Sequence, residues 1–158
     1  MNMFLMIFRA PRPSRTDDMK AVAKPRWIRK GYDGLTLFGT IITHTTQEAE
    51  VFNAHFGSLK NHEMIHLYQA RSTHDSWLLF YLRYGYYWFM ALRYHKRLKN
   101  AGYLLNPFEM EAYEHMDNLH YLDDKPAGAY GWKKYARMPI SERFSRYTKR
   151  LKQKQNNM

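Results

Sequence analysis

The chain contains no cysteine. Disulfide bonds and thiolate zinc sites are therefore excluded, so any metal ion must be bound by nitrogen and oxygen ligands. The lack of cysteine fits a reducing compartment. Acidic residues are also scarce, with 14 Asp and Glu against 25 Lys and Arg, which gives a formal net charge of +11. This charge favours anionic partners, but it does not choose among nucleic acid, phospholipid headgroups and acidic substrates.

The sequence also lacks a clear membrane-spanning or targeting segment. Residues 1–9 contain a short apolar run, but no positive charge precedes it and no small-residue cleavage site follows it, so a signal peptide is not predicted. Residues 77–92 are almost continuously apolar, yet Arg83 and Gly85 interrupt them. Because a spanning helix needs about 20 apolar residues, we expect a buried core helix, with contact to a membrane surface as the alternative. The expected location is cytoplasmic, with membrane association as the alternative.

Length and composition predict one domain with a real core. The 158 residues are 45% apolar and 16% aromatic. Residues 1–30 are rich in proline, lysine and arginine without an apolar period, and they are predicted to be a basic, extended, mobile arm. Residues 31–140 are expected to form the domain, and residues 141–158 a basic C-terminal helix and tail. The predicted fold class is α+β, mainly helical, with a small sheet.

Turn and capping signals divide the domain into short elements. Residues 35–43 are apolar and β-branched enough to predict a single strand. The expected helices cover residues 47–56, 59–71, 76–98, 107–122 and a final stretch from 141, and a short aromatic and basic piece covers residues 130–137. Ser58 or Asn61 is expected to cap the second of these helices. Asn106, followed by a proline, is expected to open the fourth.

The sequence His62-Glu63-Met64-Ile65-His66 carries the main chemical signal. Histidines four residues apart lie on one face of a helix, so their imidazoles can converge on one zinc ion. Glu63, between them, would point at whatever the metal ion binds. Three fixed residues also recur by chance, so the motif needs a third ligand from elsewhere in the chain.

The third ligand is expected from the helix that begins at Pro107. Glu109 shares a stripe with Ala112 and Tyr113 at helical spacing, and a carboxylate on such an apolar stripe is costly unless it is paired or bound to a metal. Glu111 lies about 200° around the helix from Glu109. Glu109 is therefore the predicted ligand and Glu111 the reserve. Pairing of Glu109 with Arg71 or Arg93 is the alternative without a metal.

These residues carry a family resemblance. The chain resembles the gluzincin branch of zinc metallopeptidases, in which H-E-x-x-H is completed by a glutamate on a downstream helix. It is more closely similar to small, largely uncharacterised bacterial proteins, common in Bacteroidetes, with an N-P-F-E-x-E-A-Y box, here residues 106–113. In related families the ligand precedes a small residue by three positions, which again favours Glu109. The resemblance covers about residues 31–122.

The resemblance implies a zincin-like fold, with a strand edge beside the motif helix that could bind an extended peptide. It implies one Zn²⁺ per chain held by His62, His66 and Glu109, although these ligands do not exclude iron, manganese or cobalt. It also implies that Glu63 is the general base of a peptidase that acts on a peptide or protein substrate.

One position departs from the family pattern. Several gluzincins place Asp or Asn four residues after the ligand glutamate, where it orients a metal-binding histidine. Tyr113 occupies that position here. Asp75, Asp117 or a backbone carbonyl could take over this task. The candidate donors for a developing oxyanion are Tyr113, His115, His120 and Tyr121.

Two other classes of function compete with a peptidase. In the first, the metal stabilises the domain and no substrate is processed. In the second, residues 9–30 and 143–154 bind an anionic membrane or, less favoured, nucleic acid, for which no recognised module is present. The sequence does not determine an oligomeric state.

Overall fold

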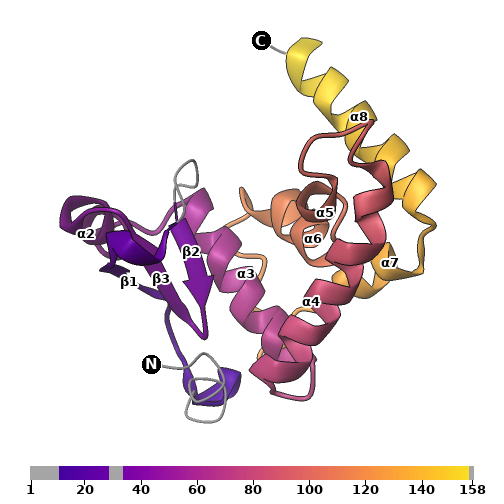
Figure 1. Ribbon diagram of the computed structural model, residues 1–158. Helices are drawn as coiled ribbons and strands as arrows, with labels where there is room; N and C mark the ends of the chain where they lie inside the picture. The colour runs from indigo at the N-terminus through magenta and orange to yellow at the C-terminus, as the bar shows by residue number, and fades with distance from the viewer. Residues whose placement is uncertain (1–10, 29–33, 157–158) are drawn as a thin grey trace.

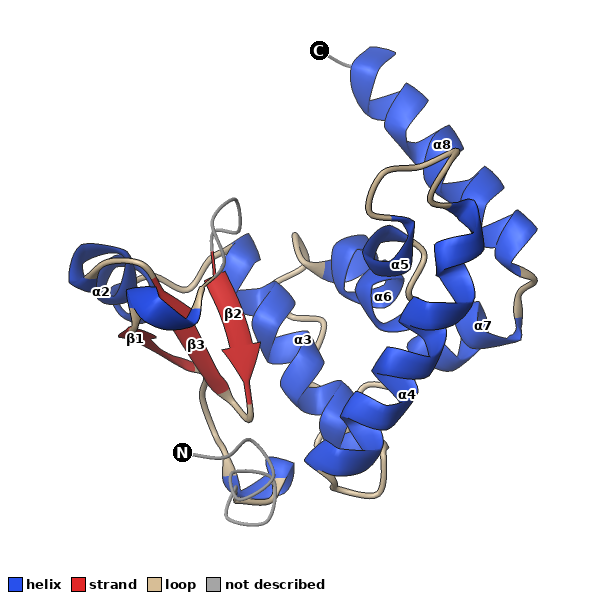
Figure 2. Cartoon of the chain, viewed as in Figure 1, coloured by secondary structure: helices blue, strands red, loops and turns tan. Residues whose placement is uncertain are grey.

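The computed structural model describes residues 11–28 and 34–156. A small sheet lies on one side of the molecule and most helices on the other, with the motif helix between them (Figure 1). The architecture is therefore mainly helical with a small sheet, as predicted (Figure 2). The strands are β1 (Lys20–Ala23), β2 (Gly34–Leu37) and β3 (Thr40–Thr43), and the helices are α2 (Thr46–Ala54), α3 (Ser58–Ser72), α4 (Trp77–Ala91), α5 (Ala101–Leu104), α6 (Pro107–His115), α7 (Trp132–Arg137) and α8 (Ile140–Asn156).

The predicted strand over residues 35–43 is in fact a hairpin. β2 and β3 pair antiparallel, with Leu37 opposite Thr40, so only Phe38 and Gly39 form the turn. Both have positive φ, 50° and 81°, as a tight two-residue hairpin turn requires. The Phe38 N–H donates to the Tyr81 hydroxyl at 3.0 Å, and the Phe38 ring packs edge-on against that of Trp77. Contacts with α4 thus stabilise a backbone conformation that phenylalanine alone disfavours.

Residues 11–28, predicted to belong to a mobile arm, contribute to the core. β1 pairs in parallel with β3 and completes the strand order β1-β3-β2. Met19 is fully buried, and Asn53 of α2 accepts from the Ala21 N–H and donates to its carbonyl. Alternation of buried and exposed side chains over only four residues was too short a pattern to predict this strand. Residues 1–10 and 29–30 of the predicted arm lie outside the described residues.

The motif helix α3 packs against elements on both of its sides. Met64 and Leu67 join the main core cluster, and Ile65 packs with Ala112 and Ala129. The helix begins after Gly57 without a side-chain cap, so the predicted caps Ser58 and Asn61 are both wrong. Burial on several faces explains why this helix has only a weak amphipathic pattern in the sequence.

The apolar helix α4 is shorter and less buried than predicted. The Ser76 hydroxyl caps it, and it ends at Ala91 instead of near residue 98. Trp77, Phe80 and Ala91 are buried. The opposite side exposes a stripe at spacings of three and four: Leu78, Leu82, Tyr86 and Phe89. Within residues 11–28 and 34–156, no helix is long and apolar enough to span a membrane.

The C-terminal helices enclose the other side of α3. Asn106 caps α6 by accepting from the Phe108 N–H, as predicted, but α6 ends at His115 rather than near residue 122. Asn61, fully buried on α3, donates to the carbonyls of Met116 and Asn118 just beyond α6. These bonds satisfy carbonyls where α6 ends and hold this end against the motif helix.

Gly128 provides a test of this packing. Its φ is +128°, and an added Cβ would lie 2.6 Å from the Ser72 nitrogen and 2.7 Å from the Tyr68 carbonyl oxygen. Gly128→Ala should therefore lower the free energy of unfolding by about 2 kcal/mol or more, measured by urea denaturation. Gly85→Ala is the matched control, because no atom lies within 4 Å of its added Cβ. That change should instead stabilise α4 by about 0.5–1 kcal/mol. Equal effects of the two changes would contradict the packing described.

Candidate metal centre

The helix α3 presents His62 and His66 to the first turn of α6. Both imidazoles are buried, because the two residues lie one helical turn apart on the face that packs against α6. Glu109, in the first turn of α6, projects its carboxylate toward them and is only 3% exposed. The structure thus brings together the three residues that the sequence predicted as ligands.

The three side chains converge on one point. The two Nε2 atoms of His62 and His66 lie 3.1 Å apart. The Glu109 carboxylate oxygens lie 3.3 Å from His62 Nε2 and 3.4 Å from His66 Nε2. A tetrahedral zinc ion with bonds of 2.0–2.1 Å needs ligand atoms about 3.3 Å apart. One atom from each side chain can therefore bind the same ion with little rearrangement.

His66 and Glu109 shift each other's pKa values in opposite directions. Burial lowers the pKa of His66, but the Glu109 and Glu63 carboxylates and the Gln69 hydrogen bond together outweigh burial and raise this pKa to about 9. Burial raises the pKa of Glu109, yet His66 and His62 lower it well below its usual range. Metal ligands must be deprotonated, so a proton on these imidazoles and a metal cation compete for the same position.

Gln69 determines which nitrogen of His66 is available. The Gln69 amide group donates to the Phe108 carbonyl at 2.9 Å and to the Glu111 carboxylate at 2.8 Å, and both of these are acceptors only. The amide oxygen must then face His66 Nδ1, 2.8 Å away. In the neutral imidazole, His66 Nδ1 therefore carries the proton, so a metal ion that displaces the second proton meets the lone pair of Nε2. Sequence reasoning missed Gln69, although it lies three residues after His66 on the same helix.

Glu111, the reserve ligand, lies in a separate network. Its fully buried carboxylate accepts from the Tyr121 hydroxyl and from the N–H groups of Gly131 and Trp132, each at 2.8 Å, in addition to Gln69. With four donors its charge is satisfied, and it is directed away from His62 and His66. Glu111 thus joins α3, α6 and the start of α7, and it orients Gln69.

Two tyrosines contact the proposed ligands. The Tyr84 hydroxyl donates to Glu109 Oε1 at 2.8 Å, which fixes the carboxylate from the α4 side. Tyr113 packs its ring edge-on against His62, with centroids 4.6 Å apart, and its hydroxyl lies 3.2 Å from that of Tyr103. His62 Nδ1 has no hydrogen-bond partner among the described residues. Tyr113, four residues after Glu109, thus makes an aromatic contact with His62 and no hydrogen bond to its Nδ1.

Glu63 lies between the proposed ligands and the sheet. It is partly buried, and its Oε2 accepts from the Thr36 hydroxyl of β2 at 2.6 Å. Its charge contributes to raising the pKa values of His66 and Tyr84. β2 is an edge of the sheet among the described strands, and Figure 1 shows it beside α3. A carboxylate thus stands between the convergent ligands and a strand edge.

The remaining candidates lie away from the three convergent side chains. His115 stacks on Tyr121 at 3.9 Å, and His120 is exposed and pairs with Asp123. Asp75 accepts from Ser14 instead of orienting a histidine. Arg71 donates to the Pro13 and Thr16 carbonyls, so it does not pair with Glu109. Of the four candidate oxyanion donors, Tyr113 alone contacts a convergent residue in the part of the chain that is described.

Comparison with known proteins gives no relative. No family model, curated protein or solved structure matches the chain. The function therefore has to be argued from the chemistry of the site rather than from the fold.

The role of Gln69 predicts an effect on metal affinity. Gln69→Leu should weaken zinc binding by about 10- to 100-fold, because His66 loses the acceptor that fixes its tautomer. Competition with a chromophoric chelator measures the change. Gln153→Leu, on the exposed side of α8, is the matched control and should bind zinc like the parent. Unchanged affinity in Gln69→Leu would contradict the assignment.

The network around Glu111 predicts an effect on stability. Glu111→Gln places an amide among four donors, so at least one buried N–H or hydroxyl loses its acceptor. Bonds to charged groups contribute about 1.5–3 kcal/mol each, and we expect a loss of about 3 kcal/mol in the free energy of unfolding. Glu114→Gln, exposed on the same helix and paired with Arg146 on the surface, should cost less than about 1 kcal/mol.

Proposed function

We propose that this protein is a zinc-dependent metallopeptidase with His62, His66 and Glu109 as ligands and Glu63 as general base. The single observation that carries the proposal is the convergence of two Nε2 atoms and a carboxylate at separations of 3.1, 3.3 and 3.4 Å. The gluzincin resemblance of residues 31–122 supports it, and so does the zincin-like arrangement of a strand edge beside the motif helix.

An incompletely satisfied carboxylate oxygen at the site supports a bound cation. Glu109 Oε2 is buried without a hydrogen-bond partner within the described part of the chain, although it lies 3.3 Å from His62 Nε2. A buried carboxylate oxygen without a donor is costly, and a cation would satisfy it. Three N and O ligands that leave a position open are typical of catalytic zinc sites.

Each protein group has a distinct task in the proposed reaction. Glu63 accepts a proton from the attacking water and later delivers it to the leaving amine. The edge of β2 binds the substrate main chain in an extended conformation. Tyr113 and Tyr103 lie on the His62 side and can donate to the oxygen that becomes negative. The metal ion would supply Lewis acidity and lower the pKa of water from 15.7 to about 7.

Metal content is the first test. Elemental analysis of the purified parent should give one zinc per chain, and His62→Ala and Glu109→Ala should each lose it, because two ligands hold zinc poorly. His120→Ala, an exposed histidine, is the control and should keep its zinc. If the parent binds no metal even after zinc is added, the proposal is wrong.

A separate variant tests catalysis. Glu63→Gln should keep the zinc, because Glu63 is not a ligand, and it should lower peptide turnover by about 10²- to 10⁴-fold through loss of the proton acceptor. A quenched-fluorescent peptide library provides the assay. Glu48→Gln, an exposed residue that belongs to the capping box of α2, is the charge-matched control and should retain activity.

A second candidate, a structural metal site without turnover, is favoured by one observation. His62, His66 and Glu109 are each less than 10% exposed, as the ligands of closed sites are. In that case zinc should raise the melting temperature strongly, no peptide should be cleaved, and Glu63→Gln should change neither zinc content nor stability. If Glu63→Gln keeps its zinc but loses all turnover, the result would instead favour the peptidase.

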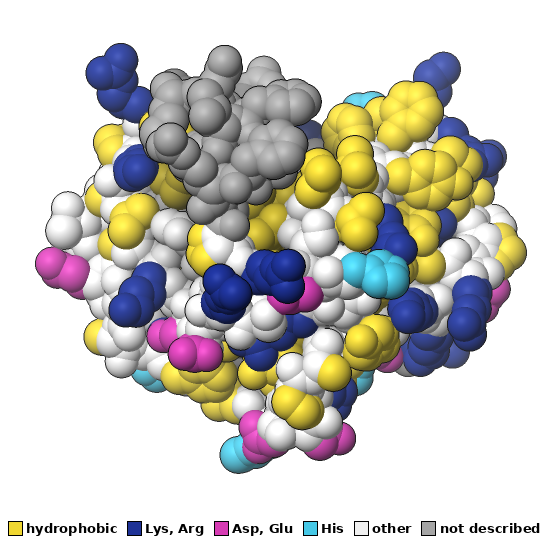
Figure 3. Space-filling model, turned by 90° about the horizontal axis from the view of Figure 1, so that it is seen from below, with side chains coloured by type: hydrophobic (Ala, Val, Ile, Leu, Met, Phe, Trp, Pro, Cys, Tyr) yellow, Lys and Arg dark blue, Asp and Glu magenta, His cyan; other side chains and the backbone are white. Residues whose placement is uncertain are grey.

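Binding of an anionic membrane or nucleic acid remains the third proposal. On the face in Figure 3, lysine and arginine side chains are spread widely rather than gathered in one stripe. In α8, Arg146 pairs with Glu114, and Arg150 donates to the Tyr113 carbonyl, so these charges already have partners. Binding of this kind should fall steeply with salt and be unaffected by His62→Ala.

A further inference from the structure

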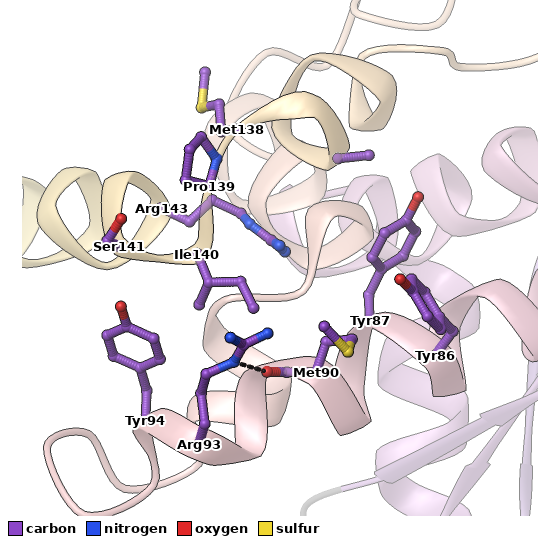
Figure 4. Close-up of a pocket in the computed structure, with 11 residues that line it drawn as sticks. Tyr86, Tyr87, Met90, Arg93, Tyr94, Met138, Pro139, Ile140, Ser141 and Arg143 are labelled. Carbon is purple, nitrogen blue, oxygen red and sulfur yellow. Dashed lines mark hydrogen bonds between the residues drawn. The ribbon is translucent and has the colours of Figure 1, made fainter.

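A pocket of about 390 Å³ lies where the start of α8 meets the end of α4, beside the α7–α8 corner. Apolar side chains such as Met90, Met138 and Ile140 line part of it, and Tyr86, Tyr87 and Tyr94 line another part. Figure 4 shows that two arginines, Arg93 and Arg143, extend into the space between the helices. No carboxylate from the described residues lines the pocket.

Arg143 is a buried charge without a counter-ion. Arg143 is only 4% exposed. Nη1 donates to the Leu105 carbonyl at 2.8 Å, and the guanidinium carbon lies 6.0 Å from the centre of the Tyr87 ring. Nε is buried without a partner, and no acidic residue pairs with Arg143 among those described. A buried unpaired charge is strongly destabilising, so its presence calls for an anion.

The surroundings of Arg143 add to the positive potential. Arg93 has its Nε bonded to the Met90 carbonyl, which leaves the outer edge of its guanidinium free to bind. α8 is 17 residues long and begins at the pocket, so the positive end of its dipole lies there too. The one acid in its first turn, Glu142, is exposed and does not line the pocket. Burial lowers the pKa of Arg143, as expected for a cation without an opposite charge.

We propose that this pocket binds a phosphate ester, with Arg143 and Arg93 holding the phosphate and the tyrosines and apolar side chains holding the organic group. Planar guanidinium groups bind phosphate oxygens in pairs, and the Tyr86, Tyr87, Tyr94 and Ser141 hydroxyls offer more donors than a carboxylate could use. An inorganic anion alone would leave the apolar lining unfilled.

The organic group could come from a soluble ester or from a lipid. Tyr86 belongs both to the pocket and to the exposed stripe of α4, in which Phe89 is 68% and Leu82 60% exposed. An apolar surface that leads to an anion site fits a phospholipid headgroup as well as a free phosphate ester. The two sources share the same phosphate chemistry, and they can be distinguished by experiment.

Two measurements on the full chain test the proposal. Thermal unfolding is followed with inorganic phosphate, phenyl phosphate and, as the neutral control, phenol. Co-sedimentation is measured with vesicles of phosphatidylcholine with or without phosphatidic acid. Phenyl phosphate should raise the melting temperature by a few degrees, inorganic phosphate less, and phenol not at all. If the ligand is a soluble ester, phenyl phosphate should raise the melting temperature clearly and the protein should not co-sediment with either kind of vesicle. A lipid source predicts co-sedimentation with phosphatidic acid vesicles and a weaker effect of phenyl phosphate.

Variants separate specific binding from attraction by net charge. Arg143→Met should abolish the effect of the phosphate probes, and without ligand its melting temperature should equal or exceed that of the parent, because an unpaired buried charge is removed. If it fails to fold, Arg143→Lys and Arg93→Gln, which preserve packing better, should each weaken binding by about tenfold. Lys99→Gln, exposed and outside the pocket, removes the same charge and should bind like the parent.

The opposite results overturn the proposal. They are an absence of any response in the folded parent, an undiminished response in Arg143→Met, or an equal loss in Lys99→Gln and Arg93→Gln. Zinc content provides an independent readout: it should be the same in Arg143→Met as in the parent, since Arg143 contacts none of the proposed metal ligands.

Discussion

The buried carboxylate of Glu111 is the interaction on which the arrangement of the helices depends. It accepts two backbone N–H groups at the start of α7, a tyrosine hydroxyl from the preceding loop and the side-chain amide of Gln69 on α3. One charged group thereby satisfies donors from three segments of the chain. Because Gln69 in turn orients His66, the relative position of α3 and α6 and the chemistry of the proposed ligands are determined by the same hydrogen bonds.

Two glutamates only two residues apart on α6 therefore serve different purposes. Glu109 faces the histidines and is held by Tyr84, whereas Glu111 faces the opposite way and holds the fold together. Both carboxylates are almost fully buried, and each is surrounded by groups that stabilise its charge. The N-P-F-E-x-E-A-Y box thus combines a capped helix start, a proposed ligand and a structural anion within eight residues.

Sequence reasoning placed His62 and His66 together because helical spacing alone decides which side chains share a face. It chose Glu109 from an apolar stripe on a second helix and from the family resemblance. It could not identify Gln69, since the role of this amide depends on the Phe108 carbonyl and on Glu111, which are close only after α6 has packed. The hairpin at Phe38 and β1 were missed for a related reason. The positive φ of Phe38 is stabilised by α4, and β1 is a strand because β3 pairs with it. Arg143 has the sequence context of a solvated basic helix, and only the packing of α8 on α4 and α5 buries it.

The hairpin of β2 and β3 is attached to the helices at two points, one in β2 and one in the turn that follows it. Thr36 donates to Glu63 on α3, and the Phe38 N–H donates to Tyr81 on α4. These two hydrogen bonds hold the hairpin in place, so in the proposed peptidase the substrate, rather than the strand, would have to change conformation in order to pair with the edge of β2. Ordering costs about 1–2 kcal/mol per residue, and here that entropy loss would fall on the incoming chain. In the proposed peptidase, such an edge would select chains that are already unstructured and discriminate against segments held in folded proteins.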